Sequence, residues 1–346
     1  MKTWRRLTST MVVLSLVLVA CGGGDGEEAG TANEEGSDTT TVEAAQLVAI
    51  AGSSIDFISL IPIAAWECAA EEGVEVEQRF VEDAATAIQA MQQGDAQIGT
   101  NIGVNVGVPA VEAGASIVDV VATQRPTWAL AVEPSIQSFD DLEGKRIAVH
   151  GEASFTRAVS NYFADINGYE YEELIIPGSE VRAEALAQGQ IDAAVIDLPD
   201  VVQLSETYPG SFEVLVTIGE EFPELIEQDI WLDRDWAEAN EDQATTVVQC
   251  IVDAMRTMTN DTEYALELAV ENLPDMDEQV LAELVEEYST RDLWPADGLL
   301  TPERALSTLT FFNDVGEIEI DEPTEESLDD YFNFSYLETA LQNLDG

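Results

Sequence analysis

The chain has 346 residues, and its 69 Asp and Glu against 13 Lys and Arg give a formal net charge of −56. This balance argues against binding to nucleic acid, because little basic surface remains to displace counterions from phosphates. One His and three Cys leave few ligands for a His/Cys metal site or a Ser-His-Asp enzyme, and we expect no cofactor. Hydrophobic residues make up 46% of the chain, so the acidity does not indicate disorder.

The first 20 residues are typical of an export signal. Lys2, Arg5 and Arg6 precede an apolar stretch, Met11–Ala20, that is too short for a membrane span of ~20 residues. The stretch ends in Leu-Val-Ala-Cys at 18–21, which resembles the lipobox of bacterial lipoproteins. The resemblance implies that Cys21 is lipidated and anchors the mature protein to the cell membrane, facing the extracytoplasmic side. A secretory signal without lipidation is the alternative.

Residues 21–44 are expected to form a flexible tether. The segment is a run of Gly, Glu, Asp, Ser and Thr with almost no apolar side chain before Val42. Such a segment cannot bury a core, and its like charges repel one another.

The excess of acidic residues indicates the kind of environment in which the protein works. Without residues 1–20 the chain carries 10 Lys and Arg against 69 Asp and Glu, a formal charge of −59. Self-repulsion between carboxylates destabilises a compact state at low salt, and salt screens it. We interpret the composition as adaptation to a saline, halophilic setting. An acidic exported protein from an ordinary habitat is the alternative.

From Gln46 to about Asp200, strand and helix patterns alternate, which predicts an α/β fold. The first apolar strand is Leu47–Ala51. A helix pattern follows over residues 61–69 and ends at Gly73, and a strand covers 74–77. A second helix pattern ends at Gly94 and leads into a strand over 96–100.

The same order recurs 95 residues later. Gly168 corresponds to Gly73, Gly189 corresponds to Gly94, and residues 168–195 need no gap to match residues 73–100. A constant offset across several elements predicts two similar lobes.

Three segments resemble the nitrate/sulfonate/taurine-type (SsuA-like) solute-binding proteins of ABC transporters. They are Ala90–Ile98, Ile136–Val149 and Ala185–Ala194, of which the second matches most specifically. The resemblance covers essentially the whole mature chain. It implies a two-lobed type II periplasmic-binding-protein (Venus-flytrap) fold.

In that fold, lobe I would comprise residues 45–133 and 229–346, and lobe II would comprise residues 134–228. Two crossing hinge strands would lie near Leu130–Pro134 and Leu215–Asp233. Ligands of open α/β sheets bind beyond the carboxyl ends of the strands, which would here face each other across the cleft.

The resemblance also implies a function without catalysis. The protein would capture a small solute and deliver it to an ABC permease and its ATPase, and we expect a monomer. A solute-binding sensor that feeds a signalling receptor is one alternative. A pyrimidine-synthase-like enzyme is another, but the Cys-rich segment of those enzymes does not occur in this sequence.

The candidate ligand-binding residues follow predicted strand ends or begin a helix. From lobe I they are Ser53, Ser54, Asp56, Phe57, Asn101, Arg125 and Trp128, and from lobe II they are Ser154, Phe155, Thr156 and Asp197. Several have plainer interpretations. Ser54, Asp56 and Ser154 could cap helices, Arg125 could pair with a surface acid, and Asp197 could be solvated.

The class of solute stays open at this point. Arg125 and a free helix N-terminus suit a sulfonate, a nitrate or a carboxylate. Phe57, Trp128 and Asp197 suit a polar heterocycle or an amine. Cys68 and Cys250 lie on predicted helices of lobe I, where they form either a disulfide or two separate thiols.

Overall fold

The computed structural model describes residues 46–53, 55–152 and 154–346. These residues belong to one compact unit, Ala44–Gly346. The expected signal peptide, the tether and Cys21 lie outside the described residues, as does Ser54.

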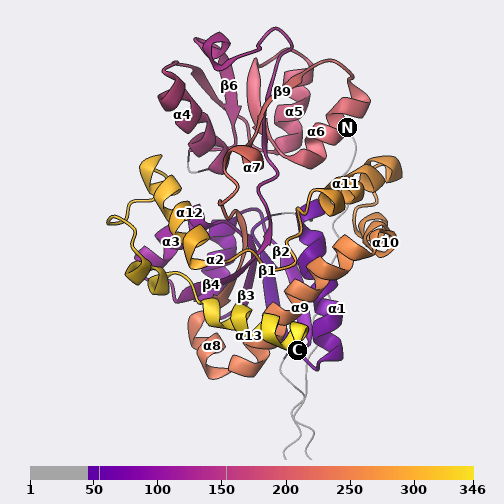
Figure 1. Cartoon of the computed structure of the whole chain (residues 1–346), viewed down its shortest axis with the longest axis vertical. Helices are drawn as coiled ribbons and strands as arrows, with labels where there is room; N and C mark the ends of the chain where they lie inside the picture. The colour runs from indigo at the N-terminus through magenta and orange to yellow at the C-terminus, as the bar shows by residue number, and fades with distance from the viewer. Residues whose placement is uncertain (1–45, 54, 153) are drawn as a thin grey trace, which may run out of the picture. The chain divides into compact units, whose positions relative to one another are not determined.

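Two five-stranded mixed sheets form the framework of this unit (Figure 1). In the first sheet the strand order is β2-β1-β3-β10-β4, in which β1 is parallel to β2 and β3, and β10 is antiparallel to β3 and β4. Its strands are β1 (Leu47–Ala51), β2 (Val76–Phe80), β3 (Ile98–Ile102), β4 (Ile117–Gln124) and β10 (Gln228–Asp233). All residues of β3 and β4 are buried, as expected for strands covered on both faces.

The second sheet has the order β7-β6-β8-β5-β9. Here β6 is parallel to β7 and β8, and β5 is antiparallel to β8 and β9. Its strands are β5 (Ala129–Val132), β6 (Arg146–Val149), β7 (Glu172–Ile175), β8 (Ala193–Ile196) and β9 (Glu213–Thr217).

Helices flank both sheets. In the chain, the helices that follow strands of the first sheet are the short helix η1 (Phe57–Ser59), α1 (Leu60–Glu71), α2 (Ala84–Gln92), α3 (Val104–Glu112) and α8 (Arg234–Ala239). The second sheet is accompanied by η2 (Phe139–Leu142), α4 (Phe155–Asn167), α5 (Ser179–Ala187), α6 (Leu198–Thr207) and α7 (Ile218–Glu221). The C-terminal part adds α9 (Glu241–Asn260), α10 (Thr262–Asn272), α11 (Glu278–Thr290), α12 (Pro302–Asp314), η3 (Glu325–Asp330) and α13 (Phe334–Asp345).

The repeat that the sequence predicts is confirmed by the strand order. In each sheet the first of three parallel strands lies between the second and the third, and an antiparallel strand separates the third from the last. Gly73 and Gly168 end their helices with φ of 83° and 74°, and Gly94 and Gly189 have φ of 78° and 69°. This left-handed conformation favours glycine, which explains why the same residue recurs at the same offset.

The chain passes from the first sheet to the second between Gln124 and Ala129, and it returns between Thr217 and Gln228. This corrects the expected crossing at Leu130–Pro134, because Ala129–Val132 pairs with β8 and β9 inside the second sheet. We therefore propose that the second lobe begins at Ala129 rather than at residue 134. The other lobe boundaries stay a prediction.

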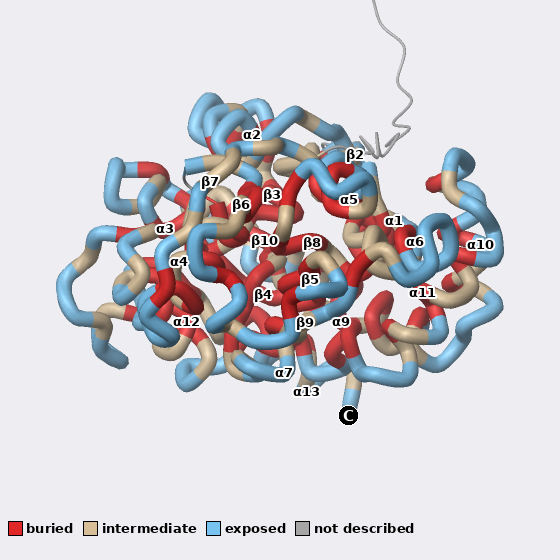
Figure 2. The backbone as a smooth tube through the Cα atoms, turned by 90° about the horizontal axis from the view of Figure 1, so that it is seen from above, coloured by how far each residue is buried: buried red, intermediate tan, exposed pale blue. Residues whose placement is uncertain are grey.

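Alternating side chains of the second sheet pack on two different helix layers. Leu130, Ile147 and Val195 belong to a large core that includes α4, whereas Ala148 and Ile196 pack with residues of α5 and α6 in a smaller core. Figure 2 shows the buried strands β4, β5, β8 and β10 in the middle of the view, with partly exposed helices around them.

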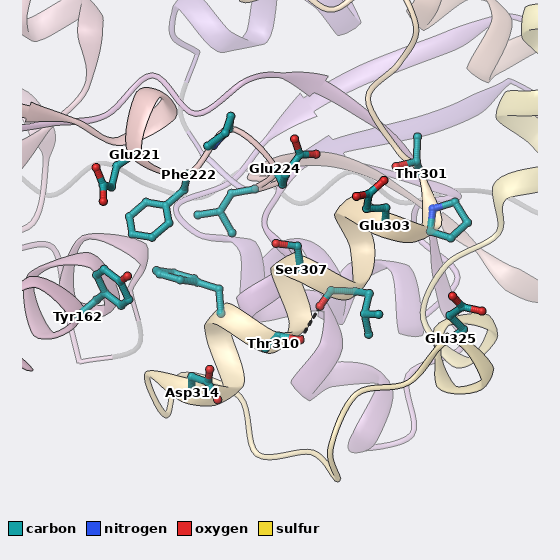
Figure 3. A pocket seen from close by; sticks show the side chains of 15 residues that line it. Tyr162, Glu221, Phe222, Glu224, Thr301, Glu303, Ser307, Thr310, Asp314 and Glu325 are labelled. Carbon is teal, nitrogen blue, oxygen red and sulfur yellow. Dashed lines mark hydrogen bonds between the residues drawn. The ribbon is translucent and has the colours of Figure 1, made fainter. Parts of the chain in front are cut away.

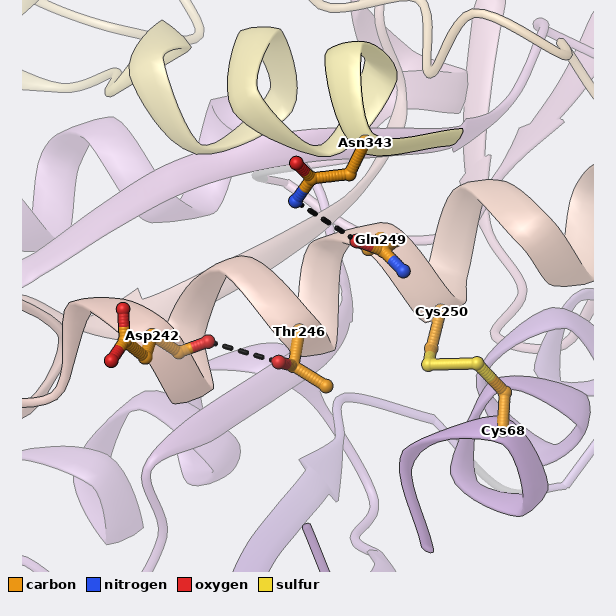
Figure 4. Close-up of a disulfide and its surroundings, with 6 residues drawn as sticks. All are labelled: Cys68, Asp242, Thr246, Gln249, Cys250 and Asn343. Carbon is orange, nitrogen blue, oxygen red and sulfur yellow. Dashed lines mark hydrogen bonds between the residues drawn. A yellow bond between two sulfur atoms is a disulfide. The ribbon is translucent and has the colours of Figure 1, made fainter. Parts of the chain in front are cut away.

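A disulfide joins Cys68 on α1 to Cys250 on α9, two helices that pack along each other (Figure 4). The Cα atoms are 5.6 Å apart, within the ~7 Å that a disulfide can span. Of the two interpretations that the sequence left open, the structure has the bonded one.

None of the described helices combines the length and the apolar composition that a bilayer crossing demands.

Candidate functional site

Residues from both sheets and from both connecting segments come together where the chain passes between the sheets. We call Asp56, Asn101, Thr127, Trp128, Asp197, Glu227 and Tyr288 the junction cluster.

Asp56 enters this cluster directly after β1. Its side chain accepts a hydrogen bond from the backbone N–H of Ser59 at 3.2 Å, and the Ser59 hydroxyl donates to Asp56 Oδ1 at 2.8 Å. This is the capping interaction of η1, so one of the two interpretations of Asp56, a helix cap, is confirmed. As a whole residue, Asp56 is half-buried.

Asn101 lies near the end of β3 with φ of 55°, a left-handed conformation that Asn tolerates better than most residues. Its Nδ2 donates to the hydroxyls of Ser53 at 3.3 Å and Ser59 at 3.2 Å. The first loop and β3 therefore meet through Asn101.

The second sheet contributes Asp197, which follows β8 and caps α6 by accepting from the backbone N–H of Leu198 at 2.8 Å. The Thr127 hydroxyl also donates to Asp197 Oδ1. Since Thr127 belongs to the first connecting segment, this hydrogen bond joins that segment to the strand ends of the second sheet.

The two connecting segments are themselves joined. The indole N–H of Trp128, in the first segment, donates to Glu227 Oε1, at the end of the second. The ring of Trp128 lies 6.1 Å from that of Phe155, at the start of α4. Phe155 in turn lies 6.1 Å from Phe312 on α12. Aromatic contacts thus continue from the second sheet's helices to the C-terminal helices.

A second aromatic group borders the cluster. Phe57, Tyr288 on α11 and Trp294 after α11 are all buried, with ring centroids 4.9 to 5.9 Å apart. The hydroxyl of Tyr288 lies beside Thr127, and the carboxylates of Asp197, Glu227 and Asp56 act on it. Burial and these charges raise the pKa of Tyr288 well above its usual range.

The charge of Asp197 acts on the other two carboxyl groups of the cluster, Asp56 and Glu227. Burial raises the pKa of Asp56 to about 7, opposed by the Ser59 hydrogen bond and assisted by the charge of Asp197. Burial raises the pKa of Asp197, and the hydrogen bond from Thr127 lowers it. Burial also raises the pKa of Glu227 well above its usual range, and the charge of Asp197 adds to this effect. A proton or a cation would relieve this repulsion.

Several candidates from the sequence are not part of this cluster. Arg125 donates to a backbone carbonyl and a carboxylate oxygen of Asp292, the latter at 2.8 Å, so its surface-pairing interpretation is the one the structure has. Ser154 is the N-cap of α4, and the Thr156 hydroxyl accepts from the backbone N–H of His150 at 2.8 Å. Both hydroxyls are buried and serve the α4 turn.

Sequence reasoning missed Thr127, Glu227, Tyr288 and Trp294. A weak signal existed for Glu227, which together with Gln228 and Asp229 interrupts the apolar residues of the segment 225–232. No local pattern marked Tyr288, because the helices α9 to α11 bring it to the junction from far along the chain.

A separate cavity of about 1050 Å³ lies between α4, α7 and α12 (Figure 3). Its lining contains aromatic rings and five carboxylates, from Glu221, Glu224, Glu303, Asp314 and Glu325, but none of the candidate residues. Among the described residues, no group of three His, Cys, Asp or Glu is placed to hold a metal ion.

Comparison with known proteins identifies the fold. The chain is similar to the periplasmic aliphatic sulphonate binding protein SsuA of Escherichia coli, with 17% identity over 83% of this chain and 92% of that one and a TM-score of 0.66. The periplasmic nitrate-binding protein NrtA of Synechocystis has 11% identity over 87% and 89%, with a TM-score of 0.68. A ligand-binding component of an ABC-type import system from Staphylococcus aureus, with zinc bound, has 11% identity over 85% and 98%, also with a TM-score of 0.68. Curated protein sequences gave no match.

These identities are low, so the structural likeness speaks for the fold, and the family rests on a sequence model. The model described as NMT1/THI5 like matches residues 70–265, more than half of the chain. The chain therefore belongs to the NMT1/THI5-like family and has the type II periplasmic-binding-protein fold that its sequence predicts.

Proposed function

We propose that the protein is an extracytoplasmic solute-binding protein of an ABC importer and that the junction cluster is its solute site. One observation carries this proposal. The cluster gathers polar and aromatic side chains from the strand ends of two sheets and from both segments that connect them. A solute held there would contact both sheets, so its binding energy would favour one arrangement of the two.

The comparisons support this role by analogy. The similar structures from Escherichia coli and Synechocystis are named as periplasmic binding proteins, and the one from Staphylococcus aureus as part of an ABC-type import system. In our proposal the protein hands its solute to a permease driven by an ATPase, acts as a monomer, and is held at the outer face of the membrane by a lipid on Cys21. No catalytic step is needed.

A thermal-shift screen tests solute binding. The solutes would be sulfonates, nitrate, carboxylates, amines and polar heterocycles. A solute at 100 times its dissociation constant adds about 2.7 kcal/mol to the free energy of unfolding, which a melting curve resolves. If no class raises the melting temperature, the proposed function is wrong.

The site is then tested by calorimetry on two variants. Trp128→Ala removes a ring and a hydrogen-bond donor at the junction, and Asp197→Asn removes a charge but keeps a capping residue. Matched controls are Trp236→Ala on α8 and Asp261→Asn, which caps α10 in the same way. We expect the junction variants to weaken binding about tenfold or more. Unchanged affinity in both would move the site elsewhere.

A further inference from the structure

The junction cluster offers many hydrogen-bond acceptors. Asp56, Asp197 and Glu227 bring three carboxyl groups, and the charge of Asp197 acts on both of the others. Such a group needs a positive partner or protons, because like charges in a buried place repel strongly.

Asn101 also presents an acceptor. The Ser59 hydroxyl gives its single proton to Asp56 Oδ1, so Ser59 must accept from Asn101, and this fixes the amide with Nδ2 toward Ser59. The other amide atom, Asn101 Oδ1, is buried and has no hydrogen-bond partner among the described residues. Asn101 is only 6% exposed, so water cannot readily satisfy this oxygen.

Glu227 repeats the pattern. It is 4% exposed; Oε1 receives the Trp128 indole N–H, whereas Oε2 is buried without a partner in the described part of the chain. Leaving a buried carboxylate oxygen unpaired is costly, and a donor from outside the chain would remove the cost.

The nearby arginines do not supply that donor. Arg125 is held by Asp292. Arg182 is fully buried, and it donates hydrogen bonds to the backbone carbonyl groups of Ile176, Gly178 and Val195. Its charge lowers the pKa of Asp197. Its third nitrogen, Nη2, is buried without a hydrogen-bond partner among the described residues, so no hydrogen bond joins Arg182 to a carboxylate of the cluster.

Aromatic rings lie beside the same acceptors. The half-buried Trp128 donates a hydrogen bond to Glu227 and contacts Phe155. Tyr288 lies beside Thr127, and its ring is 4.9 Å from that of Phe57. Ring faces attract cations by about 0.5–2 kcal/mol, more when water is excluded. Carboxylates and ring faces therefore favour the same kind of ligand.

We propose that the solute of this site is a small organic cation, an ammonium or amidinium group with N–H donors, held by Asp56, Asp197, Glu227 and Asn101 against the neighbouring rings. This inference rests on the proposed function and names its substrate class. It opposes the charge of the solutes for which the similar sulphonate- and nitrate-binding proteins are named.

The proposal predicts the sign of the pH dependence. In the empty protein the carboxyl groups hold protons more tightly than usual, and a bound cation would displace them, so affinity should rise with pH. The charged or titratable groups that face the cluster are Arg182, Asp200, Asp229 and Tyr288. An anionic solute would give the opposite slope, because protonation would favour it.

Matched pairs of probes test the inference on the full mature chain. Benzylammonium is compared with benzenesulfonate, butylammonium with butanesulfonate, and benzamidinium with benzamide, by thermal shift and then by calorimetry. Agmatine and choline widen the cation set, and Zn²⁺ and Ca²⁺ alone form separate arms. We expect cations to bind and their dissociation constants to fall from about pH 5.5 to about pH 8.

Two variants localise the effect. Glu227→Gln and Asp197→Asn should each weaken the cation about tenfold and flatten its pH dependence, whereas the control Asp261→Asn should change neither. Both junction variants replace a carboxyl group whose ionised form is disfavoured by burial. They should therefore fold at least as stably as the parent above about pH 7, and melting curves check this.

Each outcome decides something. If the sulfonates bind and the cations do not, the cation inference is overturned while solute binding stands. A response to Zn²⁺ or Ca²⁺ alone likewise overturns it. If nothing in any arm binds, the proposed function fails together with the inference.

Discussion

In the described part of the molecule, two sets of carboxyl groups with raised pKa values have different surroundings. Asp119 on β4 and Asp229 on β10, which we call the core pair, are fully buried inside the first sheet. Their carboxyl oxygens have no hydrogen-bond partner among the described residues. The junction cluster, in contrast, takes its acids from both sheets and surrounds them with Thr127 and Trp128, which donate hydrogen bonds to two of them.

The comparison teaches that a raised pKa does not by itself mark a binding site. Burial raises the pKa of Asp119 and of Asp229 well above the usual range, and the charge of Asp119 raises that of Asp229 further. The same cause acts on Glu227. What separates the two groups is position, because Asp119 lies within β4, whereas the junction cluster gathers residues from the strand ends of both sheets, where a solute would meet both.

The largest expected effect comes from removing the disulfide, which should lower stability without changing solute binding. The disulfide closes a loop over a sequence separation of 182 residues. Replacing Cys68→Ser and Cys250→Ser together should lower the free energy of unfolding by about 3–5 kcal/mol, because the unfolded chain gains freedom. Urea unfolding measures this. Solute affinity should stay the same, since neither cysteine belongs to the junction cluster, and a large loss of affinity would contradict the separation.

The core pair should show a stability effect of intermediate size. An unfolded Asp ionises above about pH 4, while the folded carboxyl keeps its proton to a higher pH, so the free energy of unfolding falls as the pH rises through that window. Asp119→Asn with Asp229→Asn should remove this slope and stabilise the protein by about 1–3 kcal/mol at about pH 8. Urea melts at about pH 5 and pH 8 give the result. A parent whose stability rises across this range would show that the pair is not protonated.

The smallest effect concerns the exposed acids outside both groups. Because residues 21–346 carry a formal charge of −59, screening should stabilise the protein, with the melting temperature rising by about 5 °C between about 0.1 and 1 M NaCl or KCl. The double variant of the core pair, Asp119→Asn with Asp229→Asn, should show the same rise in melting temperature, because it keeps all the exposed acids that salt screens. Flat melting curves would reject the saline interpretation.

Much of the fold could be predicted because its signals are local and repeated. The duplication was predicted from Gly73 and Gly168 and from the strand patterns that follow them. The first crossing was misplaced, because the short apolar run Ala129–Val132 fits either a connection or a buried strand. Its pairing with β8 and β9 depends on residues more than 60 positions away.

Residues of the junction cluster could be predicted from the sequence only where they follow strand ends. Asp56, Asn101, Trp128 and Asp197 lie at such positions, and the structure places them in one cluster. Arg125 was a candidate for binding an anionic solute because cations are rare in this chain. The many acids made an ion pair an equal alternative, and in the structure Arg125 pairs with Asp292. Partners that come from distant helices leave no trace in a local pattern.

Calorimetric titration of Asp197→Asn and Asp119→Asn, side by side with the parent, tests the central claim most directly. The titrant is the tightest-binding probe from the solute screen. If the junction cluster is the solute site, Asp197→Asn weakens binding about tenfold or more, and Asp119→Asn leaves the dissociation constant within about twofold of the parent. Equal losses in both variants, or a loss confined to Asp119→Asn, would contradict the assignment of the site to the junction.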